Sequence, residues 1–510
     1  MMRIATAWSV ALSGLEGAVV QVEVATGQGL PKITLVGLPD SALYQARERV
    51  RAAICGSGYA FPQQILTINL APASLPKTGS HYDLAIAAAI LAAMEEVPVD
   101  MVDSTMFFGE LGLDGTVRKV RGILPAMLAA SRAGYERVFV PKGQAREAAL
   151  VPGLTVWAVG NLHEVVDLLH GRPVHPCLDE PAKSLTDARE PADFADVQGH
   201  SDGKWAMEVA AAGRHHVYLH GAPGVGKTML ASRLPSILPD LGHEDAIEVS
   251  ALHSLAGQEL ESGLVVRPPY SDPHHSSTMA ALVGGGGREI RPGSISLAHR
   301  GVLFLDEAPE FGSRTLDALR TPMENGWVTI GRVSQQVRYP ARFQLVLASN
   351  PCPCGMAGVV GKQCTCPAMT VRRYQERLSG PILDRIDIRH HMLPLTRAFL
   401  ADSDIAPEKS ADVLARVIEA RARQRNRLRD TPWRTNGEVP GSYMRKKLPL
   451  PEDLGPLERG LSKGTLSARG VDRVLRLAWT LADLDGEDRI GTSNLRVAML
   501  MRQGELARVA

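Results

Sequence analysis

The chain contains few cysteines, few aromatic residues and almost no net charge. Six cysteines in 510 residues argue against a disulfide framework and favour a reducing compartment. Lysine and arginine total 56 against 55 aspartates and glutamates, which excludes a uniformly basic protein that coats nucleic acid. No apolar run reaches the roughly 18 residues of a membrane span, and the N-terminus lacks the features of a signal peptide. These absences predict a cytoplasmic protein.

The composition that remains is that of a globular, multidomain protein, with 45% apolar and 22% charged residues. Residues 1–172 alternate β-branched runs with alanine-rich helical patterns, which predicts an α+β or α/β domain. Residues 173–195 contain prolines and mixed charges without periodicity and predict a linker. In residues 196–396 strands alternate with helices, which predicts an α/β domain with a parallel sheet. Residues 397–510 predict a helical domain.

The strongest motif is a glycine-rich loop between an apolar strand and a helix, in HHVYLHGAPGVGKTML. It satisfies G-x-x-x-x-G-K-[ST] in the strand–loop–helix context of a P-loop. Backbone N–H groups of such a loop surround phosphate oxygens, and the helix N-terminus adds its positive end. We expect Lys227 to reach the β- and γ-phosphates of ATP and Thr228 to bind Mg²⁺. The predicted nucleotide-binding residues are Gly221, Ala222, Pro223, Gly224, Val225, Gly226, Lys227, Thr228 and Asp306.

Two later strands each end on polar residues suited to ATP hydrolysis. Four apolar residues precede Asp306 and Glu307 in GVLFLDEA, as expected of a buried central strand that ends at the nucleotide. Asp306 is placed to hold Mg²⁺ with Thr228, and Glu307 to act as the general base that polarises water. FQLVLASN predicts a neighbouring strand that directs Asn350 at the γ-phosphate.

Two arginines further along the chain are candidates for cations that stabilise the transition state. Arg385, in SGPILDRIDIR, is predicted to lie exposed at the end of a helix, and Arg469 begins an amphipathic helix in LSARGVDRVLRLAWTLADL. A cation supplied by a neighbouring subunit would couple hydrolysis to assembly. Each arginine taken alone is more often solvated or ion-paired, so the order of the motifs carries the assignment.

Four of the six cysteines cluster in PCPCGMAGVVGKQCTCP, directly after Asn350. Their spacing is C-x-C-x9-C-x-C, and four thiolates in a reducing compartment suit tetrahedral zinc. The C-x-C spacing is tighter than the common C-x2-C, so reduced structural thiols and a redox-sensitive pair remain alternatives. The predicted metal ligands are Cys352, Cys354, Cys364 and Cys366.

Residues 416–447 form a basic segment with ten lysines and arginines against three acids, a local charge of +7. A nucleic-acid backbone would suit such a surface. A solvated helix with distant acidic partners fits equally well. Because aromatic residues do not alternate with the arginines, the segment does not predict sequence-specific recognition of bases.

The order of these motifs resembles that of an AAA+ ATPase of the magnesium-chelatase and helicase-loader branch. The motifs are the P-loop, the Asp-Glu pair, the strand-terminal asparagine, the LDR string with Arg385 and the SAR string with Arg469. Nearly the whole chain resembles the ComM (YifB) proteins of that branch, with NPCPCG, SLAHRGVLFLDE and PARFQLVLASN as the most specific strings. The resemblance implies a homo-hexameric ring with a C-terminal lid, Arg385 as a finger acting on the neighbouring subunit, and Arg469 as the second sensor.

The resemblance also implies a DNA motor that acts by branch migration or helicase activity in homologous recombination during natural transformation. An insertion lies between the P-loop and Asp306, and the hairpin GWVTIGRVSQQVRYP precedes the Asn350 strand. Such hairpins face the central pore in related rings, so Arg332 and Arg338 are candidate contacts to branched or single-stranded DNA. A motor for metal insertion, related to magnesium chelatase, and a protein-remodelling ATPase are the alternatives.

The N-terminal domain resembles the proteolytic domain of Lon-type proteases, in APASLPKTGSHYDLAIAAAIL and FFGELGLDGTVRKVRGILPAMLAASRAGYERVFVP. Those proteases use a serine nucleophile and a lysine base. His81 stands at the expected serine position and Leu124 at the expected lysine position. Ser80 and Lys77 lie nearby in the sequence, but peptidase activity is not predicted, and the domain is interpreted as a scaffold or partner-binding module.

Overall fold

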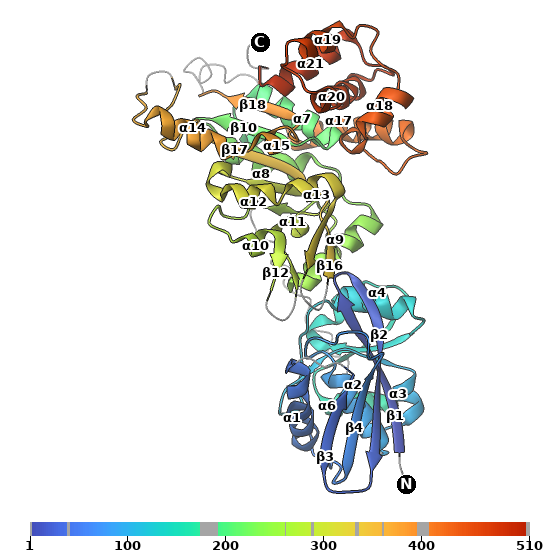
Figure 1. The fold of residues 1–510 in the computed structure, drawn as a ribbon. Coiled ribbons are helices and arrows are strands. Elements are labelled where there is room, and N and C mark those ends of the chain that lie inside the picture. Colours follow the sequence, from blue (N-terminus) through green and yellow to red (C-terminus); the bar gives the residue numbers. More distant parts are fainter. Residues whose placement is uncertain are drawn as a thin grey trace.

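The computed structural model describes residues 3–37, 41–173, 192–260, 262–286, 290–331, 336–359, 362–394 and 407–505. The molecule is elongated, with the N-terminal domain at one end, the C-terminal helices at the other and the P-loop domain between them (Figure 1). Residues 174–191 of the predicted linker lie outside the described residues. None of the helices in the described ranges is long and apolar enough to cross a membrane.

The N-terminal domain is built on a seven-stranded sheet in the order β3-β4-β2-β1-β5-β8-β9. Strands β1 (Arg3–Ser13) and β2 (Glu16–Gly27) form a long antiparallel hairpin, and the buried helix α2 (Asp83–Ala93) packs against both of them. The other strands are β3 (Lys32–Val36), β4 (Ile65–Ala71), β5 (Met106–Phe107), β8 (Arg137–Pro141) and β9 (Thr155–Val159), with β6 (Glu110–Leu111) and β7 (Val117–Arg118) paired separately. The other helices are α1 (Ser41–Gly56), α3 (Val99–Asp103), α4 (Ile123–Arg132), α5 (Ala145–Ala148) and α6 (Leu162–Leu169).

The P-loop domain contains a five-stranded sheet in the order β11-β14-β17-β10-β18, in which neighbouring strands run parallel. Every residue of β14 and β17 is buried, which explains their continuous apolar sequence. The predicted parallel α/β sheet is therefore confirmed. The strands are β10 (Val217–Gly221), β11 (Tyr270–Ser271), β14 (Val302–Leu305), β17 (Gln344–Ser349) and β18 (Ile388–Met392), with the small hairpins β12 (Gly284–Gly285)/β13 (Arg291–Pro292) and β15 (Trp327–Gly331)/β16 (Gln336–Pro340). The helices are α7 (Ser201–Gly213), α8 (Lys227–Arg233), α9 (His243–Ala256), α10 (Met279–Val283), α11 (Ser294–Leu297), α12 (Ser313–Asp317), α13 (Arg320–Asn325), α14 (Ala368–Glu376) and α15 (Gly380–Leu383).

The C-terminal domain is helical, as its sequence predicts. Its long helix α20 packs against α7 of the P-loop domain and against α17, and Trp479 of α20 is one of the largest buried side chains. The described part of this domain contains five α-helices and one short 3-10 helix (Asn436–Glu438). The α-helices are α17 (Ser410–Arg427), α18 (Gly441–Lys447), α19 (Gly455–Ser462), α20 (Ala468–Asp485) and α21 (Thr492–Gln503).

The N-terminal domain contacts the P-loop domain through α9 and the β15–β16 hairpin. At the turn between β1 and β2, a Cβ atom on Gly14 would lie 2.9 Å from the carbonyl oxygen of Arg338, so the two backbones approach closely. Near the N-terminus of α4, the amide of Leu124 donates to Oε1 of Glu147 in the same domain at 3.2 Å and to Oγ of Ser254 on α9 at 3.4 Å. The position at which Lon-type proteases place their lysine is thus covered by α9.

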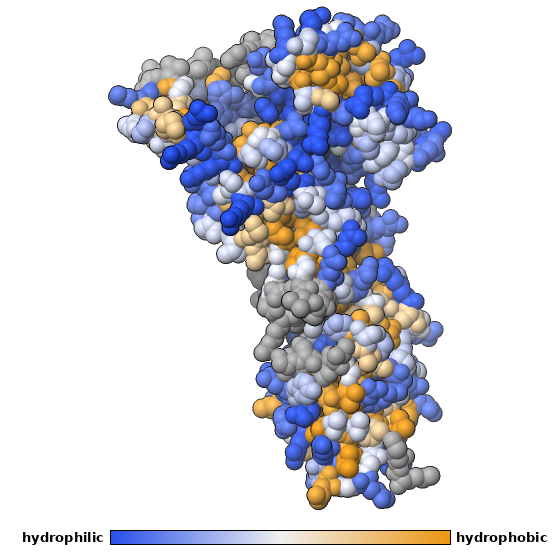
Figure 2. Space-filling view, in the orientation of Figure 1, coloured by the Kyte–Doolittle hydropathy of each residue, from blue (hydrophilic) through white to orange (hydrophobic). Residues whose placement is uncertain are grey.

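The surface shown in Figure 2 is mainly hydrophilic over the P-loop domain. Apolar side chains are visible at the far end of the N-terminal domain, where β2 ends and the strands β3 and β4 begin. Leu30, in the turn between β2 and β3, and Val36 of β3 are exposed apolar residues of this domain.

Candidate functional site

The P-loop takes its shape from three glycines between β10 and α8. Gly224 and Gly226 have φ angles of +77° and +87°, which side chains rarely adopt. Gly221 is required for a different reason, because a Cβ atom there would lie 2.5 Å from the carbonyl oxygen of Met392 on β18. Helix α8 begins at Lys227 and has no side-chain cap, so its first N–H groups face the loop.

The ammonium group of Lys227 lies at the centre of the site. Nζ donates hydrogen bonds to the carbonyl oxygens of Gly221 and Ala222, both at 2.8 Å, and to Oδ1 of Asn350 at 3.0 Å. Burial lowers the pKa of Lys227, while the carboxylates of Asp306 and Glu307 oppose that shift. The sheet order explains why Asn350 contacts Lys227, because β17, which precedes Asn350, lies between β10 and β14.

Thr228 and Asp306 form a pair of oxygen donors beside this lysine. Thr228 Oγ1 donates a hydrogen bond to Asp306 Oδ2 at 2.7 Å, and Asp306 Oδ1 accepts one from the amide of Glu307 at 2.8 Å. A hydroxyl and a carboxylate are the ligand types that Mg²⁺ takes in nucleotide sites, so the residues present fit this ion.

Glu307 extends from the end of β14 in a left-handed backbone conformation, with φ of +49°. Its carboxylate is 47% exposed, and its Oε2 lies 3.7 Å from Nδ1 of His275. A solvent-accessible carboxylate next to the Thr228–Asp306 pair can accept a proton from water. His275 is not predicted as a site residue, because it precedes Glu307 by 32 residues and carries no motif of its own.

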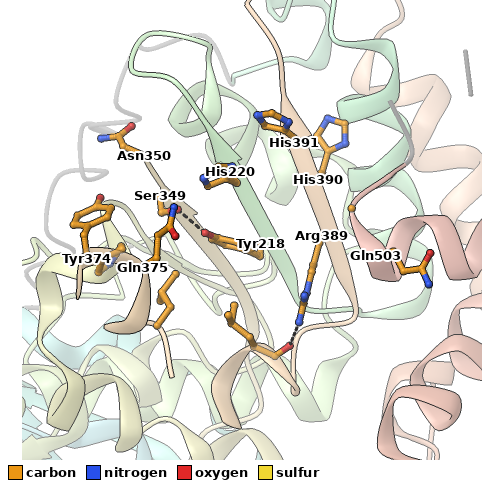
Figure 3. A pocket seen from close by; sticks show the side chains of 14 residues that line it. Tyr218, His220, Ser349, Asn350, Tyr374, Gln375, Arg389, His390, His391 and Gln503 are labelled. Carbon is orange, nitrogen blue, oxygen red and sulfur yellow. Dashed lines mark hydrogen bonds between the residues drawn. The ribbon is translucent and has the colours of Figure 1, made fainter. Parts of the chain in front are cut away.

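A cleft of about 400 Å³ opens beside Asn350. In Figure 3, His220 lies between Asn350 on one side and His390 and His391 on the other. Tyr218 and Ser349 form a 2.6 Å hydrogen bond in the same cleft. Burial lowers the pKa values of His220 and His390 to about 4, so both imidazoles are neutral at physiological pH. The sequence does not predict this cleft, since its residues come from separate strands.

Arg385 and Arg469 lie away from the P-loop, at the edge of the sheet where β10 and β18 begin. The sequence predicts an exposed Arg385, but the residue is only 7% exposed, because its guanidinium forms an ion pair with Glu324. Arg469 and Glu324 both line a cavity of about 530 Å³ that also includes His216 at the start of β10. We refer to this cavity, lined further by Arg342, Arg473 and Arg476, as the finger-side cavity.

The four clustered cysteines converge on one point. The sulfur atoms of Cys352, Cys354 and Cys364 are 3.3 to 3.7 Å apart, and the sulfur atoms of all four cysteines lie within 4.8 Å of one another. Four thiolates about 2.3 Å from a tetrahedral zinc ion would be separated by about 3.8 Å. The donor set therefore fits zinc, and these distances are too long for disulfide bonds.

The cysteine loop packs directly on the P-loop. A Cβ atom on Gly355, which follows Cys354, would lie 2.3 Å from Cγ of Pro223. The backbone of the cysteine loop thus approaches Pro223 as closely as a glycine allows. A change in the position of the cysteine loop at Gly355 would therefore also displace Pro223 of the P-loop.

Of the two arginines predicted to contact DNA, Arg332 lies outside the described residues. Arg338 is an exposed residue of β16, and its guanidinium lies 5.5 Å from the ring centre of Trp327 on the paired strand β15.

Much of the basic segment at residues 416–447 is occupied by contacts inside the protein. Arg416 pairs with Glu208 at 2.5 Å, and Arg427 pairs with Asp483 at 2.7 Å. Arg427 also lies over the ring of Trp479. These contacts favour the interpretation of a helix with distant acidic partners over a surface for nucleic acid.

In the N-terminal domain, the residues near the expected peptidase site do not form a catalytic pair. Nε2 of His81 lies 2.9 Å from the carbonyl oxygen of Val10, and burial lowers the pKa of His81 to about 4. Ser80 donates a hydrogen bond to Glu110, while buried Lys77 donates one to the carbonyl oxygen of Pro72. The hydroxyl and the amine therefore have separate partners.

Comparisons with known proteins cover nearly the whole chain. Residues 193–399 match the family "Magnesium chelatase, subunit ChlI", residues 22–144 match "Subunit ChlI of Mg-chelatase", and residues 407–502 match the C-terminal family of the same subunit. An uncharacterized protein of Mycobacterium tuberculosis is 48% identical over 98% of this chain and 99% of its own length. Competence protein ComM of Haemophilus influenzae is 38% identical over 98% of this chain and 97% of its own length.

A shorter match concerns Lon protease 2 of Bacillus subtilis, which is 30% identical over 97 residues. That match covers 19% of this chain and 17% of the protease. It agrees with the Lon-like resemblance of the N-terminal domain.

Proposed function

Because the chain belongs to the magnesium-chelatase-like AAA+ ATPases that include ComM and YifB, we propose that it is a ring-forming motor that remodels branched DNA at the cost of ATP. The observation that carries the ATPase part is the convergence of Lys227, Asn350 and the Thr228–Asp306 pair on one place. The DNA part rests on the similarity to ComM over the full chain. The proposed role is branch migration in homologous recombination during natural transformation, in the cytoplasm.

The residues at the P-loop supply what hydrolysis of the γ-phosphate requires. Lys227 and the loop amides would hold the phosphates, and Thr228 and Asp306 would hold Mg²⁺, which neutralises charge on the phosphate oxygens. Glu307 would accept the proton of the attacking water, and Asn350 would position that water or the γ-phosphate. Lys227 would then exchange its present hydrogen bond to Asn350 for phosphate oxygens.

Arg385 and Arg469 are proposed to act on the ATP of a neighbouring subunit. Their place at the edge of the sheet opposite the P-loop supports this assignment, since neither can serve its own site from there. The finger-side cavity carries several arginines beside Glu324, so it suits the phosphates of a bound nucleotide. A phosphate entering it would replace the Glu324 carboxylate as the partner of Arg385. A ring, proposed to be a hexamer, follows from this arrangement.

DNA is proposed to pass along the β15–β16 hairpin, where Arg338 presents an exposed cation. An arginine in this position would contact the phosphate backbone of DNA, and such contacts do not depend on the base sequence. The alternatives are a motor for metal insertion and a protein-remodelling ATPase whose N-terminal domain binds clients. Both alternatives predict an ATPase rate that is indifferent to DNA, so the rate with and without a four-way DNA junction distinguishes them from the proposed function.

We further propose that the four cysteines bind one zinc ion, and we expect about one equivalent of zinc per chain in protein purified without chelators. Replacing Cys364 with serine removes a ligand and should lower the zinc content below about half an equivalent. Elemental analysis of the purified proteins measures both values.

The matched control for this experiment is Cys55→Ser, because Cys55 is an exposed cysteine outside the cluster. This variant should retain the zinc content of the unmodified protein. A zinc content below about half an equivalent per chain in the unmodified protein would contradict the zinc site and favour reduced structural thiols.

A further inference from the structure

A third cavity, of about 220 Å³, lies between the P-loop domain and the C-terminal domain. The P-loop domain contributes Arg214, which follows α7, and Arg300, which precedes β14, whereas Arg421 and Arg425 come from α17. Five arginines and three acidic residues line the cavity, which we call the arginine cavity. Its charged lining residues are Arg214, Arg300, Arg421, Arg425, Arg434, Asp240, Asp245 and Glu438.

Two of the three acidic residues are already shared among three of the arginines. Asp245 pairs with Arg300 at 3.0 Å and with Arg434 at 2.6 Å. Glu438 pairs with Arg214 at 2.7 Å. Positive charge therefore exceeds negative charge in the lining, and the excess lies on the two arginines of α17.

Within the described part of the chain, Arg421 and Arg425 form no ion pair with a carboxylate. Arg421 instead donates from Nε and Nη2 to the carbonyl oxygen of Ala211, at 3.0 and 2.7 Å. Burial and the nearby charges of Arg214 and Arg425 together lower the pKa of Arg421 to about 10, while the carboxylate of Glu438 opposes that shift. Two like charges beside this half-buried guanidinium favour the binding of an anion.

Two further groups favour an anion in the same place. The Nε atom of Arg300 is buried and has no hydrogen-bond partner among the described residues. The 14-residue helix α9 begins beside Gly242, a lining residue that provides no side-chain cap, so the positive end of the helix dipole is directed here.

We propose that the arginine cavity binds a phosphate-class anion. The guanidinium groups of Arg421, Arg425 and Arg434 can donate paired hydrogen bonds to phosphate oxygens. The cavity is smaller than the roughly 300 Å³ at which pockets for drug-sized ligands begin, so it suits phosphate, pyrophosphate or one backbone phosphate of a nucleic acid rather than a nucleoside triphosphate.

An anion in this cavity would connect the C-terminal domain to the catalytic strand. Arg300 directly precedes Gly301 and strand β14, which leads to Asp306, whereas Arg421 and Arg425 belong to α17. The site is distinct from the P-loop. It adjoins the finger-side cavity, since Arg214 and Glu438 line both, but Arg421 and Arg425 line the arginine cavity alone. Its occupancy does not depend on the proposed role of the protein in DNA remodelling.

The test uses pyrophosphate as the probe and the full-length Lys227→Ala variant as the background, because the P-loop lysine also binds phosphate. Saturating pyrophosphate should raise the Tm of this variant by about 2 °C or more. Because the finger-side cavity also suits phosphate, the comparison with Arg425→Gln assigns the binding to the arginine cavity. Adding Arg425→Gln should weaken pyrophosphate binding about tenfold in calorimetric titration, since one charge-assisted contact is lost. Arg425 is exposed, so its replacement leaves folding intact.

The matched control is Arg429→Gln, which alters an exposed arginine just beyond α17 and outside the cavity. It should bind pyrophosphate like the background variant. A labelled single-stranded oligonucleotide distinguishes the two sources of phosphate. If Arg425→Gln weakens oligonucleotide binding as well, the ligand is a nucleic-acid phosphate, and if it weakens pyrophosphate binding alone, the ligand is a free anion. Equal pyrophosphate affinity with and without Arg425→Gln would overturn the proposal.

Discussion

Replacing Glu307 with glutamine should reduce steady-state ATP hydrolysis by about 100-fold or more while leaving ATP binding almost unchanged. The substitution keeps the shape of the side chain but removes the carboxylate that is proposed to accept a proton from water. The residues proposed to contact the nucleotide are Lys227, Thr228 and the loop amides, and the substitution leaves all of them in place. Phosphate release measures the rate, and a fluorescent ATP analogue measures the affinity.

Glu310→Gln is the matched control for this prediction. Glu310 lies three residues beyond Glu307, and its carboxylate forms an ion pair with Arg377 at 2.8 Å, away from the Thr228–Asp306 pair. This variant should keep most of the ATPase activity. Near-normal turnover by Glu307→Gln would mean that another group accepts the proton, and the assignment of the general base would be wrong.

Replacing Arg385 with alanine should lower ATP hydrolysis about 1,000-fold, within the range known for arginine fingers. The loss arises at the site of the neighbouring subunit, so ATP should still bind to the P-loop of the altered chain. Arg377→Ala serves as the control, because Arg377 is a partly exposed arginine of the same segment that pairs with Glu310. It should retain most of the activity.

Mixing the two inactive variants tests whether Arg385 acts between subunits. A subunit with Arg385→Ala keeps Glu307, and a subunit with Glu307→Gln keeps Arg385, so an interface between them has a complete site. An equimolar mixture should therefore recover up to about one quarter of the normal rate if the interfaces work independently. If the mixture is no more active than either variant alone, the arginine does not act in trans.

The sequence predicts the elements around the P-loop well, because each signal is local. Strands β14 and β17 are mainly apolar and buried throughout, and β10 is apolar from Val217 to Leu219 before it reaches the glycine-rich loop. Their order in the sheet then places Asn350 beside Lys227. No strand is predicted over Arg3–Ser13, where small and polar residues interrupt the apolar pattern, although β1 pairs with β2 over its whole length.

The environment of the arginines could not be predicted, because it depends on residues far away in the chain. Arg385 is buried by its ion pair with Glu324, which lies 61 residues earlier. Arg421 donates to a carbonyl oxygen 210 residues away, in α7. A run of basic residues therefore reveals its total charge but not which of its members remain without a carboxylate partner.

The rate of ATP hydrolysis with and without a four-way DNA junction tests the central claim most directly. The unmodified protein is compared with no DNA, linear duplex, single strand and junction at fixed ionic strength, because phosphate contacts weaken as salt rises. Glu307→Gln controls for contaminating ATPases. The proposed function predicts a several-fold higher rate with the junction than without DNA. An active ATPase whose rate stays the same with every DNA would contradict it and favour a motor for proteins or metal insertion.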